Sequence, residues 1–229
     1  MTDKITPEIL FIDRYIIVCK KPVGVLSEED GNKMSIVKML KEYLLENGEK
    51  TDIFTVHRLD KGVSGVMVFA RTPKAASVIS EQMTKGETVK KYLAVINGVP
   101  EEKEGSFFDL LFRDAKKNKT YVVDRERKGV RDAKLDYLVL ETKDGLSLVK
   151  IRLHTGRTHQ IRVQFASRKM PLIGDGRYGS RDGGDTPALF SHEFSFNHPK
   201  TGKRMTFILF PDQSPFDIFK YPENNCNAD

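Results

Sequence analysis

The chain has 229 residues, enough for one sizeable hydrophobic core. Hydrophobic residues make up 39% of it, which is ordinary for a globular protein and argues against general disorder. The formal net charge of +6 modestly favours an anionic partner, although many basic enzymes bind nothing anionic.

Cysteine usage fits a reducing compartment. Cys19 lies in an apolar run and Cys226 in the terminal "NNCNAD", so a disulfide framework is not expected. No signal peptide is evident at the N-terminus, and no apolar run is long enough to span a bilayer. We expect a cytoplasmic protein, and a monomer because no spare apolar surface element stands out.

The first elements are a strand and a helix. The β-branched run "YIIVCKKPVG" (15–24) predicts a strand that Pro22 and Gly24 turn aside. Residues 34–48 have apolar positions at helical spacing. Ser35 is the expected N-cap of that helix and Gly48 its stop.

The stretch "HRLDKGVSG" (57–65) follows. The sequences "DIFTVHRL" and "GVMVFAR" (65–71) predict strands on either side of it, which would place Asp60 at a strand end. A helix is expected over 72–83, with Thr72 at its N-cap and proline in its first turn.

From residue 90 onward strands dominate. Four runs separated by turn signals predict consecutive strands, and two more follow a helix expected over 157–169. Strands in consecutive runs indicate an α+β fold with a mostly antiparallel sheet. A single domain over 1–229 is the simplest division, with 221–229 as a frayed tail.

Two patterns suggest cofactors or metals but fail on context. "GDGRYG" (174–179) matches G-x-G-x-x-G, yet no strand precedes it and "SRDGGDTP" cannot form the helix that a dinucleotide fold needs. None of the five histidines forms H-E-x-x-H or lies near a cysteine, so no metal site is expected. His192 and His198 are interpreted as satisfied surface histidines.

The window 114–134 carries twice as many basic as acidic residues. It is either a solvated hairpin or a finger that contacts phosphates. Tyr121 within it suits stacking on a base as well as cross-strand packing.

A further segment, "LHTGRTHQIRVQF" (153–165), brings a cation close to the core. Thr158 is the expected cap of the helix, and Ile161 and Phe165 lie one turn apart on its buried face. Arg162 would then point along the rim of the core, where it can meet Asp60. A bidentate pair would fix that carboxylate and keep it ionised.

Several long motifs, in order over roughly residues 10–211, resemble the RluA family of pseudouridine synthases. "YIIVCKKPVG" resembles the family's vvNKPxG strand, "HRLDKGVSGVMVFART" its HRLDxxTSG motif and "KKYLAVINGVP" its KxYxAxVxG strand. "LHTGRTHQIRVQFASRKMPLIGDGRYG" resembles its TGRxHQIR block, and "LFSHEFSFNHPKTGK" its closing strand.

The resemblance implies an isomerase that converts uridine in RNA to pseudouridine without cofactor or metal. Asp60 matches the catalytic aspartate, Tyr92 the tyrosine that packs on uracil and is assigned to proton handling at C5, and Arg162 the arginine that pairs with the aspartate. Arg58 matches the arginine that fills the gap left by the flipped nucleotide.

Ribosomal RNA and transfer RNA are both open as substrates. The RNA-contacting residues we assign are His57, Arg58, Lys116, Lys117, Arg125, Arg157, His159 and Gln160.

The chain departs from the family pattern at four positions, none of them assigned to bond-making: Lys20, Val63, Gln164 and Phe190. No S4-like RNA-binding module fits before residue 10, so target choice is expected to come from the catalytic domain.

Two other functions share these features. A non-catalytic RNA-binding or RNA-folding protein would use the basic surface but would not need Asp60. A hydrolase that cleaves an N-glycosidic bond would need a second carboxylate to activate water. The nearest candidate, Asp175, is interpreted as a turn-stabilising residue.

Overall fold

The computed structural model describes residues 6–182, 184 and 186–220, and the expected tail at 221–229 lies outside them. The α-helices are Ile36–Glu46 (α1), Pro73–Thr84 (α2) and Gln160–Ser167 (α3). The strands are Glu8–Ile12 (β1), Ile16–Lys21 (β2), Phe54–Thr55 (β3), Ser64–Ala70 (β4), Val89–Asn97 (β5), Glu104–Asp114 (β6), Lys119–Val123 (β7), Val130–Lys143 (β8), Leu146–Leu153 (β9), Leu189–Asn197 (β10) and Arg204–Ile208 (β11).

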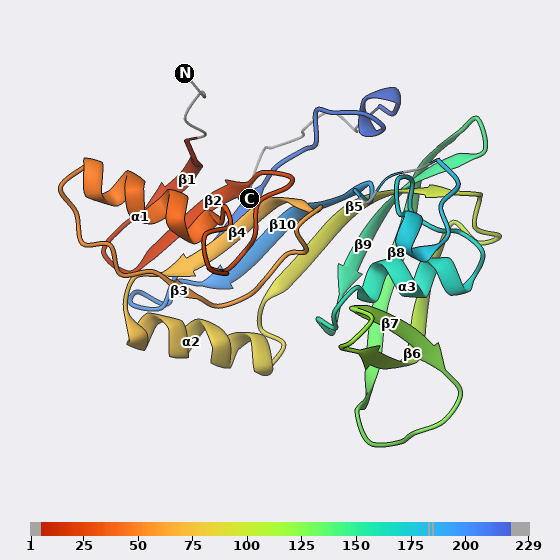
Figure 1. The fold of residues 1–229 in the computed structure, drawn as a ribbon, viewed down its shortest axis with the longest axis horizontal. Helices are drawn as coiled ribbons and strands as arrows, with labels where there is room; N and C mark the ends of the chain where they lie inside the picture. The colour runs from red at the N-terminus through yellow and green to blue at the C-terminus, as the bar shows by residue number, and fades with distance from the viewer. Residues whose placement is uncertain (1–5, 183, 185, 221–229) are drawn as a thin grey trace.

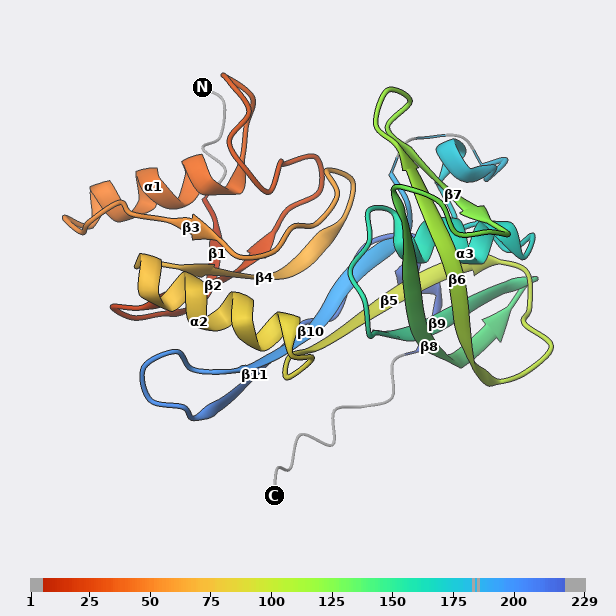
Figure 2. The same cartoon turned by 90° about the horizontal axis from the view of Figure 1, so that it is seen from below.

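One extended sheet organises the molecule and confirms the predicted α+β class. Its strand order is β1-β2-β4-β10-β5-β9-β8-β6-β7, with β3 on β4 and β11 on β10. Figure 1 shows α1 and α2 at the end of the sheet that holds β1, β2 and β4, and α3 at the end that holds β6 to β9. Figure 2 shows β5 and β10 running between these two halves.

Where the two halves of the sheet meet, the backbones of β4 and β10 lie very close together. Strand β10 pairs with β4 in parallel and with β5 in antiparallel, and Ser191 lies opposite both Gly65 and Tyr92. Gly65 has a φ of +117°, and a Cβ there would lie 2.2 Å from the Ser191 carbonyl oxygen. Only glycine satisfies both conditions. This contact sets how far the residues just before β4 lie from those on β5.

The predicted helix caps of the first half are confirmed. The Ser35 hydroxyl accepts a hydrogen bond from the Lys38 backbone N–H, and Thr72 does the same for Ala75. Gly48 follows α1 with a φ of +68°, as a helix stop requires. These local signals depend only on residues three or four positions apart, which is why they could be read directly from the sequence.

Two predictions of local structure, at Asp60 and before Arg162, are wrong. Asp60 does not end a strand, because β3 stops at Thr55 and residues 56–63 form an irregular connection to β4. Helix α3 begins at Gln160 instead of near 157, and its N-cap is His159 in the left-handed conformation, not Thr158. The Thr158 carbonyl accepts instead from the Thr120 hydroxyl, which ties this turn to β7.

The sequence did not indicate the strands β1 and β6. It also gave the wrong burial for two histidines. His192 and His198 are not surface residues, since they are only 3% and 5% exposed. Both are satisfied: His192 bonds to the Leu209 carbonyl and His198 to the Asp13 carboxylate. Cys19 is fully buried, as expected.

The "GDGRYG" segment contains a single turn of 3-10 helix at Gly176–Tyr178, and no α-helix follows it in the described residues, which agrees with rejecting a dinucleotide fold. None of the helices within the described ranges is long and apolar enough to cross a membrane.

Candidate active site

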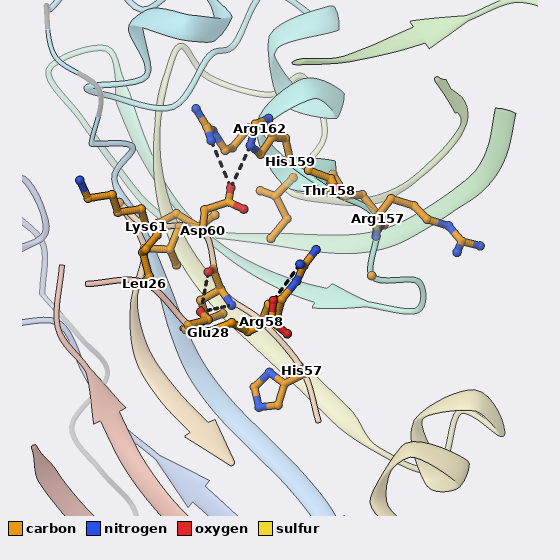
Figure 3. A pocket seen from close by; sticks show the side chains of 18 of the residues that line it. Leu26, Glu28, His57, Arg58, Asp60, Lys61, Arg157, Thr158, His159 and Arg162 are labelled. Carbon is orange, nitrogen blue, oxygen red and sulfur yellow. Dashed lines mark hydrogen bonds and ion pairs between the residues drawn. The ribbon is translucent and has the colours of Figure 1, made fainter. Parts of the chain in front are cut away.

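A cleft of about 1330 Å³ lies between the two halves of the sheet. Three segments far apart in the chain line much of it: 26–30, 55–63 and 156–162. Tyr92 and Lys90 on β5 contribute to its wall. Figure 3 shows Asp60 in this cleft, facing Arg162 and His159 across from its own connection.

The connection that carries Asp60 is irregular but firmly held. The Ser27 hydroxyl donates to the Leu59 carbonyl at 2.7 Å and accepts from the Leu59 N–H at 3.0 Å. The Leu59 side chain is buried in the core, and the Asp60 carbonyl accepts from the Val63 N–H. Asp60 therefore has a fixed backbone without belonging to a strand.

Lys21 adds a second tie to this connection. Its side chain is fully buried, and Nζ donates to the carbonyls of Pro22 and Val25 at 2.9 and 2.7 Å, and to that of Lys61 at 3.3 Å. Burial lowers the pKa of Lys21 to about 8, while the negative charge of Asp60 acts in the opposite direction. Sequence reasoning missed Lys21, although it stands directly before Pro22 in the first motif.

Arg162 contacts Asp60, as predicted, but the expected bidentate geometry belongs to a different carboxylate. Arg162 Nη1 lies 3.1 Å from Asp60 Oδ2. Its Nε and Nη2 donate to the two oxygens of Asp175, both at 2.7 Å. Asp175 is fully buried, so the interpretation of its side chain as a turn element is wrong.

This arrangement keeps Arg162 charged in a buried place. Burial by itself lowers the pKa of Arg162, but the hydrogen bonds and charges of Asp175 and Asp60 outweigh it and raise the pKa. The guanidinium also lies over the Tyr178 ring, 5.1 Å from its centroid. Asp175 thus anchors the cation, and the cation presents its remaining nitrogen to Asp60.

His159 lies between Asp60 and the Tyr178 hydroxyl. Its Nε2 lies 3.7 Å from Asp60 Oδ2, and its Nδ1 lies 2.9 Å from the Tyr178 hydroxyl. That hydroxyl accepts from the Thr120 N–H and can donate its own proton to Nδ1; in the tautomer that this bond favours, the ring proton lies on Nε2 and faces Asp60. Burial lowers the pKa of His159, and the Asp60 charge partly opposes this.

Tyr92 is buried on β5, beside the cleft. Burial raises its pKa above the usual range, the nearby charge of Asp60 raises it further, and a hydrogen bond with Ser191 acts in the opposite direction. The phenol therefore carries its proton at neutral pH.

The other residues assigned to RNA contact differ in their surroundings. Arg58 is exposed and paired with Glu28 at 3.0 Å. Arg157 lines the cleft, but its side chain points away from Asp60 in Figure 3 and its Nε donates to the Asp132 carbonyl. His57 also lines the cleft, where its Nε2 accepts from the Val68 N–H.

His57 is held neutral. Its ring stacks on Phe194 with centroids 4.6 Å apart. Burial lowers its pKa to about 3, and the charge of Lys90 contributes in the same direction.

Gln160 lines the cleft, but its amide is used internally. It is only 3% exposed, its Oε1 accepts from the Thr155 hydroxyl and the Arg157 N–H, and its Nε2 donates to the Lys134 carbonyl. The amide therefore shapes the turn before α3, and an RNA contact at Gln160 stays a prediction.

The basic window lies at the margin of the site. Lys116 and Lys117 are exposed in the turn between β6 and β7, and Arg125 is exposed in the connection after β7, but none of the three lines the cleft. Arg113 and Arg177 do line it and were not predicted. Tyr121 lies opposite Phe112 on the neighbouring strand, which agrees with cross-strand packing.

The side chains at the four departures from the family pattern make none of the contacts described above for the side chains of Asp60, Tyr92 and Arg162. Lys20 pairs with Glu8, and Val63 and Phe190 are buried in the core. Gln164 donates to Asp109, while its Oε1 has no partner in the described part of the chain. Within the same residues, no cluster of three or more His, Cys, Asp or Glu side chains suits a metal ion.

A family model described as RNA pseudouridylate synthase matches residues 15–167, a span that contains Asp60, Tyr92 and Arg162. This chain belongs to that family. The synthase is thus an isomerase acting on RNA, and the predicted resemblance is confirmed.

Two relatives illustrate the similarity. The chain is 33% identical over 218 residues to the Bacillus subtilis RNA pseudouridine synthase YhcT, covering 91% of this chain and 68% of that protein. It is 31% identical over 221 residues to the ribosomal large subunit pseudouridine synthase D of Borreliella burgdorferi, covering 92% and 67%.

Solved structures agree on the fold of the synthase. The human RNA pseudouridylate synthase domain containing 4 superposes with a TM-score of 0.73 at 22% identity, covering 89% of this chain and 88% of that one. The human RNA pseudouridylate synthase domain containing 1 superposes with a TM-score of 0.76 at 20% identity, covering 93% of this chain and 86% of that one.

Proposed function

We propose that this synthase isomerises specific uridines in ribosomal or transfer RNA to pseudouridine, with Asp60 as its essential side chain. The observation that carries the proposal is a carboxylate in a broad cleft, 30% exposed and held by a buried arginine. Such a group is both accessible to a nucleotide and oriented by a charged partner.

The proposed reaction breaks the bond between N1 and C1′, turns the uracil, and forms a new bond from C5 to C1′. Asp60 acts either as the nucleophile at C1′ or as the base that removes the proton at C2′. Both roles need an ionised carboxylate in a defined orientation. Arg162 Nη1 orients the carboxylate from one side, and the Nε2 atom of His159 faces the same oxygen.

Tyr92 contributes a flat surface and a proton-bearing hydroxyl. Because its pKa is raised, the phenol is a poor base in the free protein. We therefore assign it to packing against the uracil in the first steps. Proton handling at C5 would require that the phenol first pass its own proton to an acceptor.

Uridine in a paired or stacked RNA must leave the stack to reach Asp60, which costs a few kcal/mol and least in loops. In this proposal Arg58, which is exposed and lines the cleft, occupies the vacated space. To do so it must release Glu28, and because that pair is exposed its loss costs little.

The substrate is best sought first in the large ribosomal subunit, because a relative 31% identical to this chain is named for it. Pseudouridine mapping of total RNA, by carbodiimide adducts and reverse-transcription stops, would compare cells with and without the gene. A stop that disappears without the gene and returns with the wild-type gene, but not with Asp60→Asn, is the expected result. Identical maps in all strains would contradict catalysis and favour a non-catalytic RNA-binding role.

A further inference from the structure

Two adjacent lysines on β5 have opposite surroundings. Side chains alternate across a strand, so Lys90 and Tyr92 share one face while Lys91 lies on the other. Lys91 Nζ pairs with Glu193 at 2.8 Å. Lys90 lines the cleft, and its ammonium has no hydrogen-bond or ion-pair partner among residues 6–182, 184 and 186–220.

The Lys90 side chain is half-buried as well as unpaired. Its ammonium lies beside the turn that precedes α3, since a Cβ placed on Gly156 would lie 3.5 Å from Nζ. The burial that removes water from this cation also lowers the pKa of Lys90. His57, its neighbour, is neutral, so the positive charge here belongs to Lys90.

An unpaired, partly desolvated cation is unfavourable for the free protein. It becomes favourable once an anion enters the cleft, and an RNA substrate brings one phosphate per nucleotide. Lys90 lies two residues from Tyr92 on the same strand face, about 7 Å away along the strand. That separation is comparable to the distance between base and phosphate within one nucleotide.

We propose that Lys90 is a phosphate-binding residue, whose ammonium holds a phosphodiester flanking the uridine that packs on Tyr92. The proposal rests on the proposed function for the identity of that nucleotide. Gly156 keeps the approach open, since any side chain there would fill the space beside Nζ.

The test measures binding of a fluorescein-labelled pentauridylate by anisotropy as a function of salt. Lys90→Gln should bind roughly tenfold more weakly at low salt, and the slope of log K against log salt should fall by about 0.7, the value for one lost single-strand phosphate contact. Lys90→Arg should restore most of both. Lys143→Gln, which removes an exposed lysine at the far end of β8, is the matched control and should change neither.

The same protein samples also give a folding control. Because Lys90 is unpaired, Lys90→Gln should melt at or above the wild-type temperature, whereas a structural lysine would lower it. An unchanged salt slope in Lys90→Gln, or no measurable binding of the pentauridylate by wild type, would overturn the proposal. If wild type forms no pseudouridine but the slope still changes with Lys90→Gln, the proposed function fails and the phosphate site stands.

An oligomer with neutral methylphosphonate linkages separates phosphate contact from contact with uracil. Wild type should bind it more weakly than the phosphodiester, and Lys90→Gln should bind the two more equally. Equal discrimination by both proteins would contradict a phosphate contact at Lys90.

Discussion

Two parts of the cleft hold their charges in different ways. We call the part formed by Asp60, Arg162 and Asp175 the floor, and the part that carries Arg58 and Glu28 the rim. At the floor, Arg162 is 5% exposed and bonds to two carboxylates at once. At the rim, the side chains of Arg58 and Glu28 are 58% and 48% exposed and, within the part of the chain that the structure describes, bond only to each other. Removing a partner from a buried pair leaves a charge stranded, whereas exposed pairs contribute little. The floor is therefore positioned before RNA arrives, and the rim is free to exchange partners with it.

The largest effect expected at the floor is that of Asp60→Asn. We expect turnover on the mapped uridine to fall by at least about 10³-fold, because the amide can neither attack C1′ nor accept a proton from C2′. The melting temperature and the RNA affinity should change little, since the side chain is partly exposed. Retained turnover in single-turnover assays would remove Asp60 from the chemistry.

Asp175→Asn is expected to have the next largest effect. It removes the bidentate partner of a buried arginine, so we expect the free energy of unfolding to fall by about 3 kcal/mol. Arg162 would also lose its orientation, so kcat should fall by roughly 10- to 100-fold. Urea unfolding and steady-state kinetics measure the two effects.

Asp109→Asn is a matched control for that variant. Asp109 also binds an arginine through both oxygens, but its partner Arg168 is 31% exposed at the side chain and lies outside the cleft. We expect a loss of about 1 kcal/mol and near-normal kcat. Equal effects of the two substitutions on kcat would mean that Asp175 is only structural.

Outside the cleft, replacing Lys116, Lys117 and Arg125 together by glutamine should weaken RNA binding without changing kcat. Each contact that these exposed cations make with a phosphate contributes about 0.7 to 0.9 to the salt slope, so the combined slope should fall by up to about 2 to 3. Anisotropy titrations over a range of salt concentrations measure this. A normal slope would mean that the basic window is a solvated hairpin.

The stability of the protein should also depend on pH through His57, which lines the cleft. Its folded-state pKa of about 3 lies below the value of about 6.5 expected in the unfolded chain. The unfolded chain therefore binds more protons between these values, and stability is fully present above pH 6.5 and lost as pH falls. The slope for this group reaches at most about 1.4 kcal/mol per pH unit.

Urea unfolding at several pH values between 7.5 and 5.5 tests this. The lowered pKa values of His159 and His192 act in the same direction, so a residual dependence should remain after His57→Gln. The variant should nevertheless show a shallower dependence than wild type. The same pH dependence in both proteins would mean that His57 is protonated in the folded state.

The smallest effect is expected from Glu28→Gln. It frees Arg58 and removes a negative charge from the cleft lining, so RNA affinity should rise about two- to fivefold. The free energy of unfolding should change by less than about 0.5 kcal/mol. Weaker binding in this variant would show that Glu28 itself contacts the RNA.

The sequence by itself determined the elements that depend on neighbours in the chain. Hydrophobic periodicity predicted α1, and Thr72 with the proline after it predicted α2. The caps at Ser35 and Thr72 follow from hydrogen bonds that reach only three residues. The motifs around Asp60, Tyr92 and Arg162 were distinctive enough to indicate the family. Even the contact between Asp60 and Arg162, 102 residues apart, could be predicted from the family resemblance.

Only the tertiary structure decided how these residues are supported. Nothing in "GDGRYG" indicates that Asp175 is buried against Arg162, because a turn residue and a buried anion have the same local sequence. Gln160 and His57 look available for RNA until folding supplies partners for their polar atoms. The difference between Lys90 and Lys91 likewise depends on which strand face meets Glu193 and which meets the cleft. Burial and pairing arise from segments that meet only in the folded sheet, so local sequence does not encode them in readable form.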